Sequence, residues 1–263
     1  MRTKLVAGNW KMNFTTTEAA AAVEAFIRHV DAKSDVDVVL CPPLLSIPRL
    51  KDILRNSHIK LGAQDVFWVD WGAFTGKVSP AMLDEFRVSF CIVGHSETRG
   101  RFGKLEVPDS TLGYFSETDE TINLKIKALL FHSINPILCV GETREERNRG
   151  LTDEVVRAQL SGALAGIDAA ELYFLSVAYE PVWAIGTGDT CEPAEAERVC
   201  AGIRSTLADM LDPDVAEEVR ILYGGSVKAS NSDALFHLPN VDGGLVGGAS
   251  LDPMEFCSIV MSA

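Results

Sequence analysis

The chain of 263 residues contains 24 Lys and Arg against 37 Asp and Glu, which gives a formal net charge of −13. This acidic balance argues against nucleic acid or an anionic membrane surface as a partner, because both carry negative charge. The same negative charge would be expected to repel an anionic substrate. Hydrophobic residues make up 47% of the sequence and charged residues 23%, a balance that is typical of globular proteins and excludes a disordered chain.

The cysteines and the first residues favour a cytoplasmic protein. None of the six cysteines forms a C-x-x-C pair, which excludes a zinc-site spacing and a small secreted disulfide scaffold. Cys41, Cys91 and Cys139 each lie in an apolar run, as reduced core thiols do. We expect no signal peptide, and no uncharged stretch approaches the ~20 residues that span a bilayer.

Short apolar runs recur at intervals of roughly thirty residues and predict eight strands. They are rich in Val, Ile and Leu without clean alternation, which is typical of parallel strands buried on both faces. The predicted strands are 4–8, 37–41, 59–63, 90–94, 136–140, 175–180, 220–223 and 244–247.

Amphipathic stretches between these strands predict helices. In the first of them, Val23, Phe26, Ile27 and Val30 fall on one helical face. The predicted helices are 17–30, 44–55, 80–86, 117–131, 154–164, 193–210, 230–238 and 253–261. Eight strand–helix pairs without a linker predict a single domain over residues 1–263, a closed α/β barrel of eight parallel strands surrounded by helices.

A doubly wound open sheet is the alternative architecture. It would carry a glycine fingerprint after the first strand, and the sequence Gly8-Asn9-Trp10-Lys11 is not one. One segment departs from the regular pattern: residues 103–116 are polar and lie between the fourth strand and its helix. We interpret this segment as an inserted loop.

Residues whose side chains can take part in catalysis follow several of the predicted strands. Lys11 comes after the first strand, His95 after the fourth, and Glu180 ends the sixth. Each alone has an ordinary interpretation, as a solvated loop lysine, a structural histidine or a surface carboxylate. Because carboxyl ends of barrel strands meet on one face, where barrel enzymes hold their active sites, the three together indicate an active site.

Two glycine turns after the last two strands indicate a phosphate site. Gly225-Ser226 and Gly247-Gly248 stand where barrels commonly bind phosphate. Such glycine pairs mostly serve turns, but bare backbone N–H groups also bind a dianion closely. The substrate is then a small phosphate monoester.

These groups favour proton abstraction next to a carbonyl through an enediolate. Glu180 is interpreted as the base, since it is taken as the only carboxylate that ends an apolar strand on this face. Lys11 supplies positive charge. Ser96 is expected to begin a short helix whose N-terminus keeps His95 neutral, as a hydrogen-bond donor.

The residues directly after Glu180 predict a lid. An apolar centre lies between proline and glycine hinges, and closure would protect an enediolate phosphate from elimination. A packed surface loop is the alternative, but exposed Trp and Ile beside a catalytic face would be unusual. The lid comprises Pro181, Val182, Trp183, Ala184, Ile185, Gly186, Thr187 and Gly188.

Eight short sequence stretches resemble motifs of the triosephosphate isomerase family, and they occur in the family's order over nearly the whole chain. The matching stretches are AGNWKMN (7–13), GAQ (62–64), GAFTG (72–76), VGHSE (93–97), CVGET (139–143), AYEPVWAIGTG (178–188), YGGSV (223–227) and LVGGASL (245–251). The resemblance implies a TIM barrel and the interconversion of dihydroxyacetone phosphate and D-glyceraldehyde 3-phosphate, in glycolysis and gluconeogenesis. It implies no metal and no organic cofactor.

The resemblance also assigns roles by position. Glu180 matches the base that shuttles a proton between two substrate carbons, and His95 matches the neutral group that polarises the carbonyl. Lys11 matches the charge that stabilises the enediolate, with Asn9 beside it. Glu97 is expected near Lys11, and Ser96 next to it behind the site. The phosphate-binding backbone is expected at Gly186, Ser226, Gly247 and Gly248.

A homodimer is a further implication, with the loop tip at Thr75 and Gly76 inserted into the partner subunit. The family usually carries an acidic residue at the position of Lys77 and a basic one at Thr98, and these pair at its interface. Asp65 stands in place of the usual Asn. These departures concern the interface and leave the catalytic residues intact.

Three other positions and the inserted loop also depart from the family pattern. Asp189 replaces a common Lys or Arg after the lid, and Glu192 stands where a Ser or Thr cap is common. Gly244 replaces a usual Phe, whose volume something else must fill. Residues 103–116 are interpreted as a tolerated surface insertion or, alternatively, as an oligomerisation or regulatory arm.

Two other functions stay open at this point. One is isomerisation of a related phosphorylated ketose, such as a tetrulose phosphate. The other is a catalytically silent paralogue that binds phosphometabolites, which is expected to lack Lys11, His95 or Glu180. The acidity of the chain is compatible with an anionic substrate if the barrel mouth is locally positive.

Overall fold

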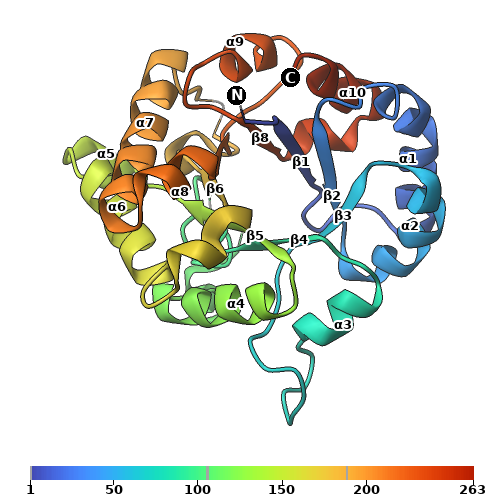
Figure 1. Cartoon of the computed structure of the whole chain (residues 1–263), viewed down its shortest axis with the longest axis horizontal. Helices are drawn as coiled ribbons and strands as arrows, with labels where there is room; N and C mark the ends of the chain where they lie inside the picture. Colours follow the sequence, from blue (N-terminus) through green and yellow to red (C-terminus); the bar gives the residue numbers. More distant parts are fainter. Residues whose placement is uncertain (1, 105–106, 188) are drawn as a thin grey trace.

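Eight parallel strands close into a barrel at the centre of the molecule. The computed structural model describes residues 2–104, 107–187 and 189–263. Neighbouring strands pair in parallel around the ring, from β1 to β8 and back to β1 (Figure 1). This confirms the predicted fold. The strands are β1 (Leu5–Asn9), β2 (Asp37–Cys41), β3 (Lys60–Ala63), β4 (Phe90–Val93), β5 (Asn135–Val140), β6 (Ser176–Tyr179), β7 (Arg220–Tyr223) and β8 (Gly243–Val246).

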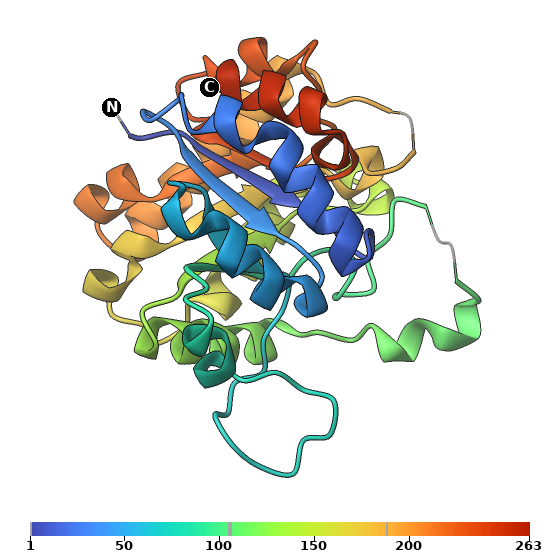
Figure 2. The same ribbon diagram turned by 90° about the vertical axis from the view of Figure 1, so that its right-hand side faces the viewer.

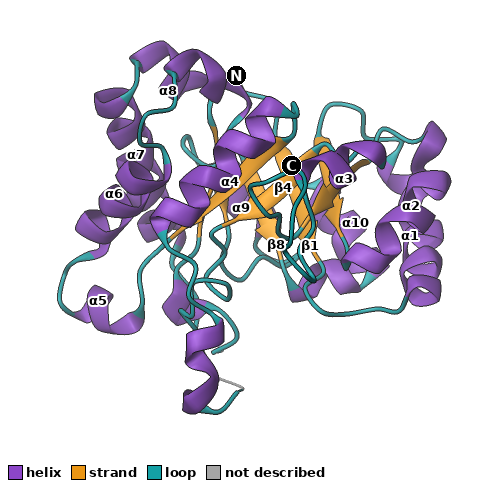
Figure 3. Ribbon diagram, turned by 90° about the horizontal axis from the view of Figure 1, so that it is seen from below, coloured by secondary structure: helices purple, strands orange, loops and turns teal. Residues whose placement is uncertain are grey.

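Helices surround the barrel on its outside (Figures 1 and 3). In chain order they are α1 (Thr16–Val30), α2 (Ile47–Ile53), α3 (Pro80–Glu85), α4 (Asp119–Phe131), α5 (Arg144–Asn148), α6 (Thr152–Ala163), α7 (Pro193–Met210), α8 (Pro213–Glu218), α9 (Ser232–Phe236) and α10 (Pro253–Met261).

Most predicted elements are found within one or two residues, and α7 and α10 coincide with the prediction. Two short helices, α5 and α8, were not expected. Periodicity cannot reveal α5, because its five residues are all polar. The expected helix over 44–55 is interrupted: α2 is flanked by the 3₁₀ turns Leu44–Ser46 and Leu54–Asn56.

The strands are buried on both faces, which explains their lack of alternation. A small apolar cluster inside the barrel includes Leu5, Phe90 and Leu222, and a larger one lies between strands and helices. At Gly244 the space of the usual phenylalanine is filled by Phe236 of α9, whose ring atoms would lie 3.1 Å from a Cβ at this glycine.

Loops at the carboxyl ends of the strands extend furthest from the barrel (Figure 2). The inserted loop carries the 3₁₀ turn η3 (Asp109–Tyr114), which projects beyond the rim. Residues 64–79, between β3 and α3, form a second projecting loop. The predicted site lies at this end of the barrel.

Candidate active site

A cavity of about 430 Å³ opens at the carboxyl ends of the strands. The loops after β1, β4, β6, β7 and β8 contribute to its wall, so the topology brings together residues from the whole length of the chain. Its lining includes Asn9, Lys11, His95, Glu180, Ile185, Gly186, Ser226, Lys228, Gly247 and Gly248.

Glu180 lies at the floor of this cavity, immediately after β6. Its side chain is only 3% exposed. One carboxylate oxygen lies 2.9 Å from Nε2 of His95, and the other accepts a hydrogen bond of 2.8 Å from the backbone N–H of Ser96. Both oxygens are therefore held, and the carboxylate faces the cavity.

The hydrogen bonds around His95 identify which ring nitrogen carries the proton. The backbone N–H of Glu97 donates to Nδ1 at 3.1 Å. A nitrogen that accepts a hydrogen bond has no proton of its own, so Nε2 carries it and donates to Glu180. In this arrangement the ring is a neutral donor that points toward the cavity.

The two groups shift each other's ionisation. Burial opposes the charged form of Glu180, but the adjacent His95 ring, its hydrogen bond and the Ser96 amide hold the pKa of this carboxyl below its ordinary value. Burial also opposes the imidazolium, whereas the Glu180 carboxylate raises the pKa of His95 above its ordinary value. The Glu97 amide on Nδ1 acts against that increase, because it binds only the neutral ring.

The expected short helix after His95 is absent, and this expectation was wrong. Residues 96–100 form hydrogen-bonded turns, in which the Arg99 N–H reaches the His95 carbonyl at 3.1 Å. The Ser96 amide, instead of serving as a helix N-terminus behind the ring, binds Glu180. The neutral ring is favoured by one amide at Nδ1, not by a helix dipole.

Lys11 is held in a left-handed backbone conformation, with φ of 51°. Non-glycine residues rarely adopt it, and such strain concentrates at functional sites. Asn9 Oδ1 accepts from the Lys11 N–H at 3.1 Å, and Gln64 Nε2 donates to the Lys11 carbonyl at 2.8 Å. The ammonium lies 2.6 Å from a carboxylate oxygen of Glu97. Gln64 belongs to the GAQ stretch, and the sequence alone predicts no role for it.

The glycine turns bring bare backbone to the cavity wall. A Cβ on Gly224 would lie 3.0 Å from Cγ of Glu180 and 3.0 Å from the Tyr179 carbonyl oxygen. Gly247 and Gly248 also line the cavity, and a Cβ on Gly247 would lie 3.7 Å from Cε of Lys11. A side chain at position 224 would force its neighbours Glu180 and Tyr179 to shift, so glycine suits this close approach.

Lys228, after β7, lines the same cavity and was not predicted. It follows the quoted YGGSV stretch by one residue, which is the only signal that could have located it. Lys11 and Lys228 are both cations, and Glu180 is the carboxylate among the lining residues. The mouth is therefore less acidic than the chain as a whole.

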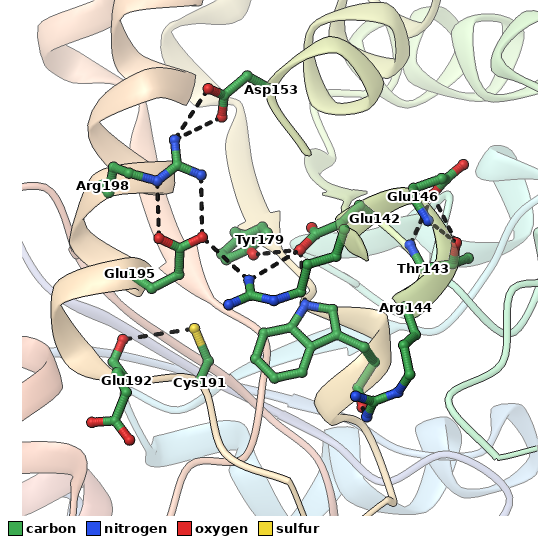
Figure 4. Close-up of polar contacts among 12 residues, drawn as sticks. Glu142, Thr143, Arg144, Glu146, Asp153, Tyr179, Cys191, Glu192, Glu195 and Arg198 are labelled. Atoms are coloured by element: carbon green, nitrogen blue, oxygen red, sulfur yellow. Dashed lines mark hydrogen bonds and ion pairs between the residues drawn. The ribbon is translucent and has the colours of Figure 1, made fainter. Parts of the chain in front are cut away.

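Glu142 is a further carboxylate near the strand ends, and the sequence did not single it out. It follows β5 and is fully buried. Oε1 accepts from the Trp183 indole N–H at 2.8 Å and from the Tyr179 hydroxyl at 3.2 Å (Figure 4). Burial raises the pKa of Glu142 above its ordinary value. Glu142 belongs to the CVGET stretch. Because it lies two residues beyond the end of β5 at Val140, its position did not mark it as a site residue.

The first half of the lid packs against the barrel. Val182–Ala184 forms the 3₁₀ turn η5, and Trp183 is only 7% exposed, so the exposure that was used to argue against a packed loop does not apply to this indole. Pro181 precedes this turn. Ile185 and Gly186 line the cavity. Thr187 Oγ1 donates to the Trp183 carbonyl at 2.9 Å, and Gly188 lies outside the described residues.

The positions that depart from the family interface pattern lie close to one another. Lys125 of α4 lies 2.5 Å from Asp65 and also pairs with Glu117. Thr98 Oγ1 donates to Glu117 at 2.6 Å. Burial raises the pKa of Asp65. Lys77 lines the shallow cavity beside these residues.

The projecting loop after β3 is exposed at its tip. Thr75 and Gly76 are both exposed, and Gly76 has a φ of 83°. Two large side chains of this loop, Trp71 and Phe74, are 73% and 45% exposed. Apolar exposure of this size is typical of a protein–protein contact surface.

The inserted loop contacts the lid at its first residue. A Cβ on Gly103 would lie 2.3 Å from the Ile185 carbonyl oxygen and 2.4 Å from that of Val182, so only glycine fits. Phe115 stacks edge-on against Phe102, at 5.4 Å between ring centres. Tyr114 is 87% exposed, and the apolar Leu105 lies outside the described residues.

Glu192 precedes α7 without any side-chain hydrogen bond to the helix start. Pro193, at the first helical position, removes one of the N–H groups that a cap would satisfy. The Glu therefore replaces a capping residue at a helix that needs less capping.

Comparison with known proteins gives one consistent result. A family model described as triosephosphate isomerase matches residues 4–263. A protein of Carboxydothermus hydrogenoformans named triosephosphate isomerase is 48% identical over 260 residues, covering 99% of this chain and 98% of its own. Proteins of the same name from Roseiflexus sp. and Clostridium tetani are 46% and 43% identical, each covering 99% of this chain and 97% and 96% of their own length.

Proposed function

The chain belongs to the triosephosphate isomerase family, it is an aldose–ketose isomerase of glycolysis, and we propose that Glu180, His95 and Lys11 carry out its chemistry. It interconverts dihydroxyacetone phosphate and D-glyceraldehyde 3-phosphate. The observation that carries the assignment is the convergence of a buried carboxylate, a neutral imidazole N–H and an ammonium on one cavity.

Glu180 acts as the base. Its lowered pKa keeps it ionised at neutral pH, so it can take a proton from the carbon next to the substrate carbonyl. The C–H electron pair moves into the new carbon–carbon double bond of the enediolate. Returning the proton to the neighbouring carbon, together with transfer of the hydroxyl proton from one substrate oxygen to the other through His95, completes the isomerisation, and no redox partner is needed.

His95 and Lys11 stabilise the oxygens on which charge develops. The Nε2–H of His95 faces the cavity. When substrate binds, this N–H can donate its hydrogen bond to a substrate oxygen in place of Glu180. The Lys11 ammonium supplies positive charge at the same mouth, held by Asn9 and Gln64 through its backbone. Ser96 and Glu97 orient these groups through the two amide hydrogen bonds and the Glu97–Lys11 ion pair.

The phosphate of the substrate binds on the glycine side of the cavity. Gly186, Ser226, Gly247 and Gly248 line it, and oriented backbone N–H groups bind a dianion without needing a basic protein. Residues 181–188 act as the lid over this group. Ile185 and Gly186 support the assignment, since they reach the cavity while Trp183 anchors the turn.

A coupled isomerase assay on the purified protein tests the assignment. We expect a higher kcat/KM with the triose phosphates than with a tetrulose phosphate, the substrate of the alternative isomerase. A higher value for the four-carbon sugar would overturn the substrate assignment. The family comparisons do not favour that alternative, and the residues that a silent paralogue would lack are all present.

We infer one domain over residues 1–263 and a homodimer. The barrel uses strands from Leu5 to Val246, which supports a single domain with an insertion at about 103–116. Exposed Trp71 and Phe74 beside the loop tip at Thr75 and Gly76 support a second copy as the partner. Light scattering during size-exclusion chromatography tests this, because a monomeric mass at micromolar protein would contradict it.

We also propose a cytoplasmic location. All six cysteines are free and buried, as expected in a reducing compartment. Among the described residues, no helix is long and apolar enough to cross a membrane. Recovery of the enzyme activity in the cytosolic fraction of its source cells is the expected result.

A further inference from the structure

One guanidinium contacts both ends of the lid. Arg144 is the first residue of α5, and its Nη2 donates to the Trp183 carbonyl at 2.8 Å. The same nitrogen pairs with the carboxylate of Asp189, beyond the other end of the lid. The guanidinium carbon also lies 5.9 Å from the centre of the Trp183 indole. Figure 4 shows Arg144 beside Thr143.

These contacts close a polar ring across the lid. Thr187 Oγ1 donates to the same Trp183 carbonyl at 2.9 Å, and the Asp189 N–H donates to Thr187 Oγ1 at 3.2 Å. Successive polar contacts thus join Arg144, Trp183, Thr187 and Asp189 into a closed ring. The ring encloses the segment that carries Ile185 and Gly186, the lid residues that line the cavity.

The base of the ring is rigid. Thr143 caps α5 in a reciprocal arrangement with Glu146, whose carboxylate accepts from the Thr143 N–H at 2.8 Å (Figure 4). Glu146 also pairs with Arg101, which donates to the Gly141 carbonyl at 3.2 Å. Arg144 therefore extends from a fixed point toward the lid.

Other residues hold the Trp183 side chain, which separates their role from that of Arg144. Glu142 binds the indole N–H, and the Arg147 guanidinium lies 4.1 Å from the ring centre. Arg147 is in turn 3.2 Å from Glu195 at the start of α7. These contacts fix only the leading end of the lid, whereas Arg144 also contacts the trailing end.

The charge balance gives Arg144 a second effect. Asp189 stands three residues after Gly186, and an unpaired carboxylate there would repel an arriving phosphate dianion. The ion pair with Arg144 neutralises it. Both side chains are 53% exposed, so the pair adds little to folding stability and is weakened by salt. Its effect is expected on the lid position and not on the fold.

We propose that Arg144 is a positioning residue for the isomerase reaction, which straps Trp183 to Asp189 and so holds Ile185 and Gly186 over the substrate phosphate. The proposal rests on the lid assignment made above. Arg144 itself touches neither the substrate nor the reacting atoms.

Two readouts report lid position separately from folding. A loosely held lid lets the enediolate phosphate lose inorganic phosphate, so phosphate released per isomerisation turnover should rise. The inhibition constant of glycerol 3-phosphate, which has the phosphate but no carbonyl, should rise as well. An exposed ion pair of ordinary strength corresponds to a change of about two- to fivefold in each.

The test compares Arg144→Met, Asp189→Asn and the double variant with Arg149→Met. Arg149 directly follows α5, and among the described residues its side chain pairs only with exposed Glu145, at 3.9 Å, so it is the matched control. We expect Arg144→Met to raise both readouts and Arg149→Met to change neither. The double variant should match Arg144→Met in phosphate release, because both substitutions break one strap, but its inhibition constant should rise less, because it leaves no unpaired carboxylate at position 189. At high salt, about 0.5 M, each of the two readouts should differ less between the Arg144→Met variant and the unchanged protein, because salt weakens the ion pair in the latter.

The outcomes separate the strap from the function on which it rests. If the unchanged protein isomerises triose phosphates but Arg144→Met leaves phosphate release and glycerol 3-phosphate inhibition as they were, the strap is wrong and the function stands. Equal effects of Arg144→Met and Arg149→Met, or losses that merely follow a lower Tm, also overturn it. Absence of isomerase activity in the unchanged protein would instead refute the proposed function.

Discussion

The two ends of the barrel use charged residues in opposite ways. At the carboxyl end, Glu180, His95 and Lys11 face a cavity, and Lys11 has a strained backbone. At the amino end, charges are paired and closed off: Arg204 lies 2.7 Å from Asp242, which Arg2 approaches at 2.8 Å on its other oxygen. Charged groups therefore face a cavity at the reactive end, whereas the paired charges at the other end stabilise the fold.

The largest effect is expected at the reactive end. Glu180→Asp withdraws the carboxylate by one methylene and should lower kcat by about 10²–10⁴-fold, because proton transfer requires close placement. Tm should change little. Steady-state kinetics and a thermal melt measure the two quantities, and an unchanged kcat would remove Glu180 from the role of base.

Substitution of a paired charge at the amino end should lower the stability of the fold and leave catalysis unchanged. Arg204→Met leaves the buried Asp242 with one fewer partner, and we expect a loss of about 3–5 kcal/mol in the free energy of unfolding. The kcat of the folded fraction should stay the same. Arg157→Met is the control, since the Arg157–Asp209 pair is exposed and should contribute less than about 1 kcal/mol. Comparable denaturation midpoints for the two variants would contradict the contrast between the ends.

Gly103→Ala sharpens the comparison within the reactive end. The added Cβ meets the lid carbonyls of Val182 and Ile185, so the lid or the inserted loop must shift. We expect kcat/KM to fall by about tenfold, since small displacements near the chemistry are costly. Gly113→Ala is the matched control in the same loop, because nothing lies within 4 Å of a Cβ there. Equal kcat/KM for both variants would show that the loop does not confine the lid.

The smallest effect concerns pH and the amino end. Burial opposes ionisation of Asp37, but hydrogen bonds from Lys60 and Arg220 lower its pKa below the ordinary value. A carboxyl with a lowered pKa stabilises the folded state above its unfolded pKa, and this stabilisation disappears as pH falls through the folded pKa.

Asp37→Asn should therefore cost about 1 kcal/mol near neutral pH and progressively less in acid. Urea denaturation at a series of pH values below neutrality measures the difference. Asp52→Asn, which alters an exposed pair with Arg55, should show a small difference at every pH. A deficit of Asp37→Asn that persists undiminished in acid would show that its ion pairs do not account for the lowered pKa.

Prediction from the sequence succeeded where local signals repeat. Apolar runs located all eight strands, and α7 and α10 were found with their proline starts because proline fixes the first turn. It missed α5, which has no apolar face, although this helix carries both arginines that hold the lid. It also missed Glu142, because a carboxylate two residues beyond a strand looks like any loop residue until its burial is known.

The sequence by itself determined the barrel, the family and the identity of the residues at the strand ends, because these depend on periodicity and on motifs contiguous in the chain. Only the tertiary structure decided how those residues act on one another. The Glu97 amide that fixes the His95 tautomer, the Gly103 contact with the lid and the Arg144 strap all join groups through space. The net charge of −13 likewise gave no account of the mouth, since two lysines reach the cavity only after the chain closes its barrel.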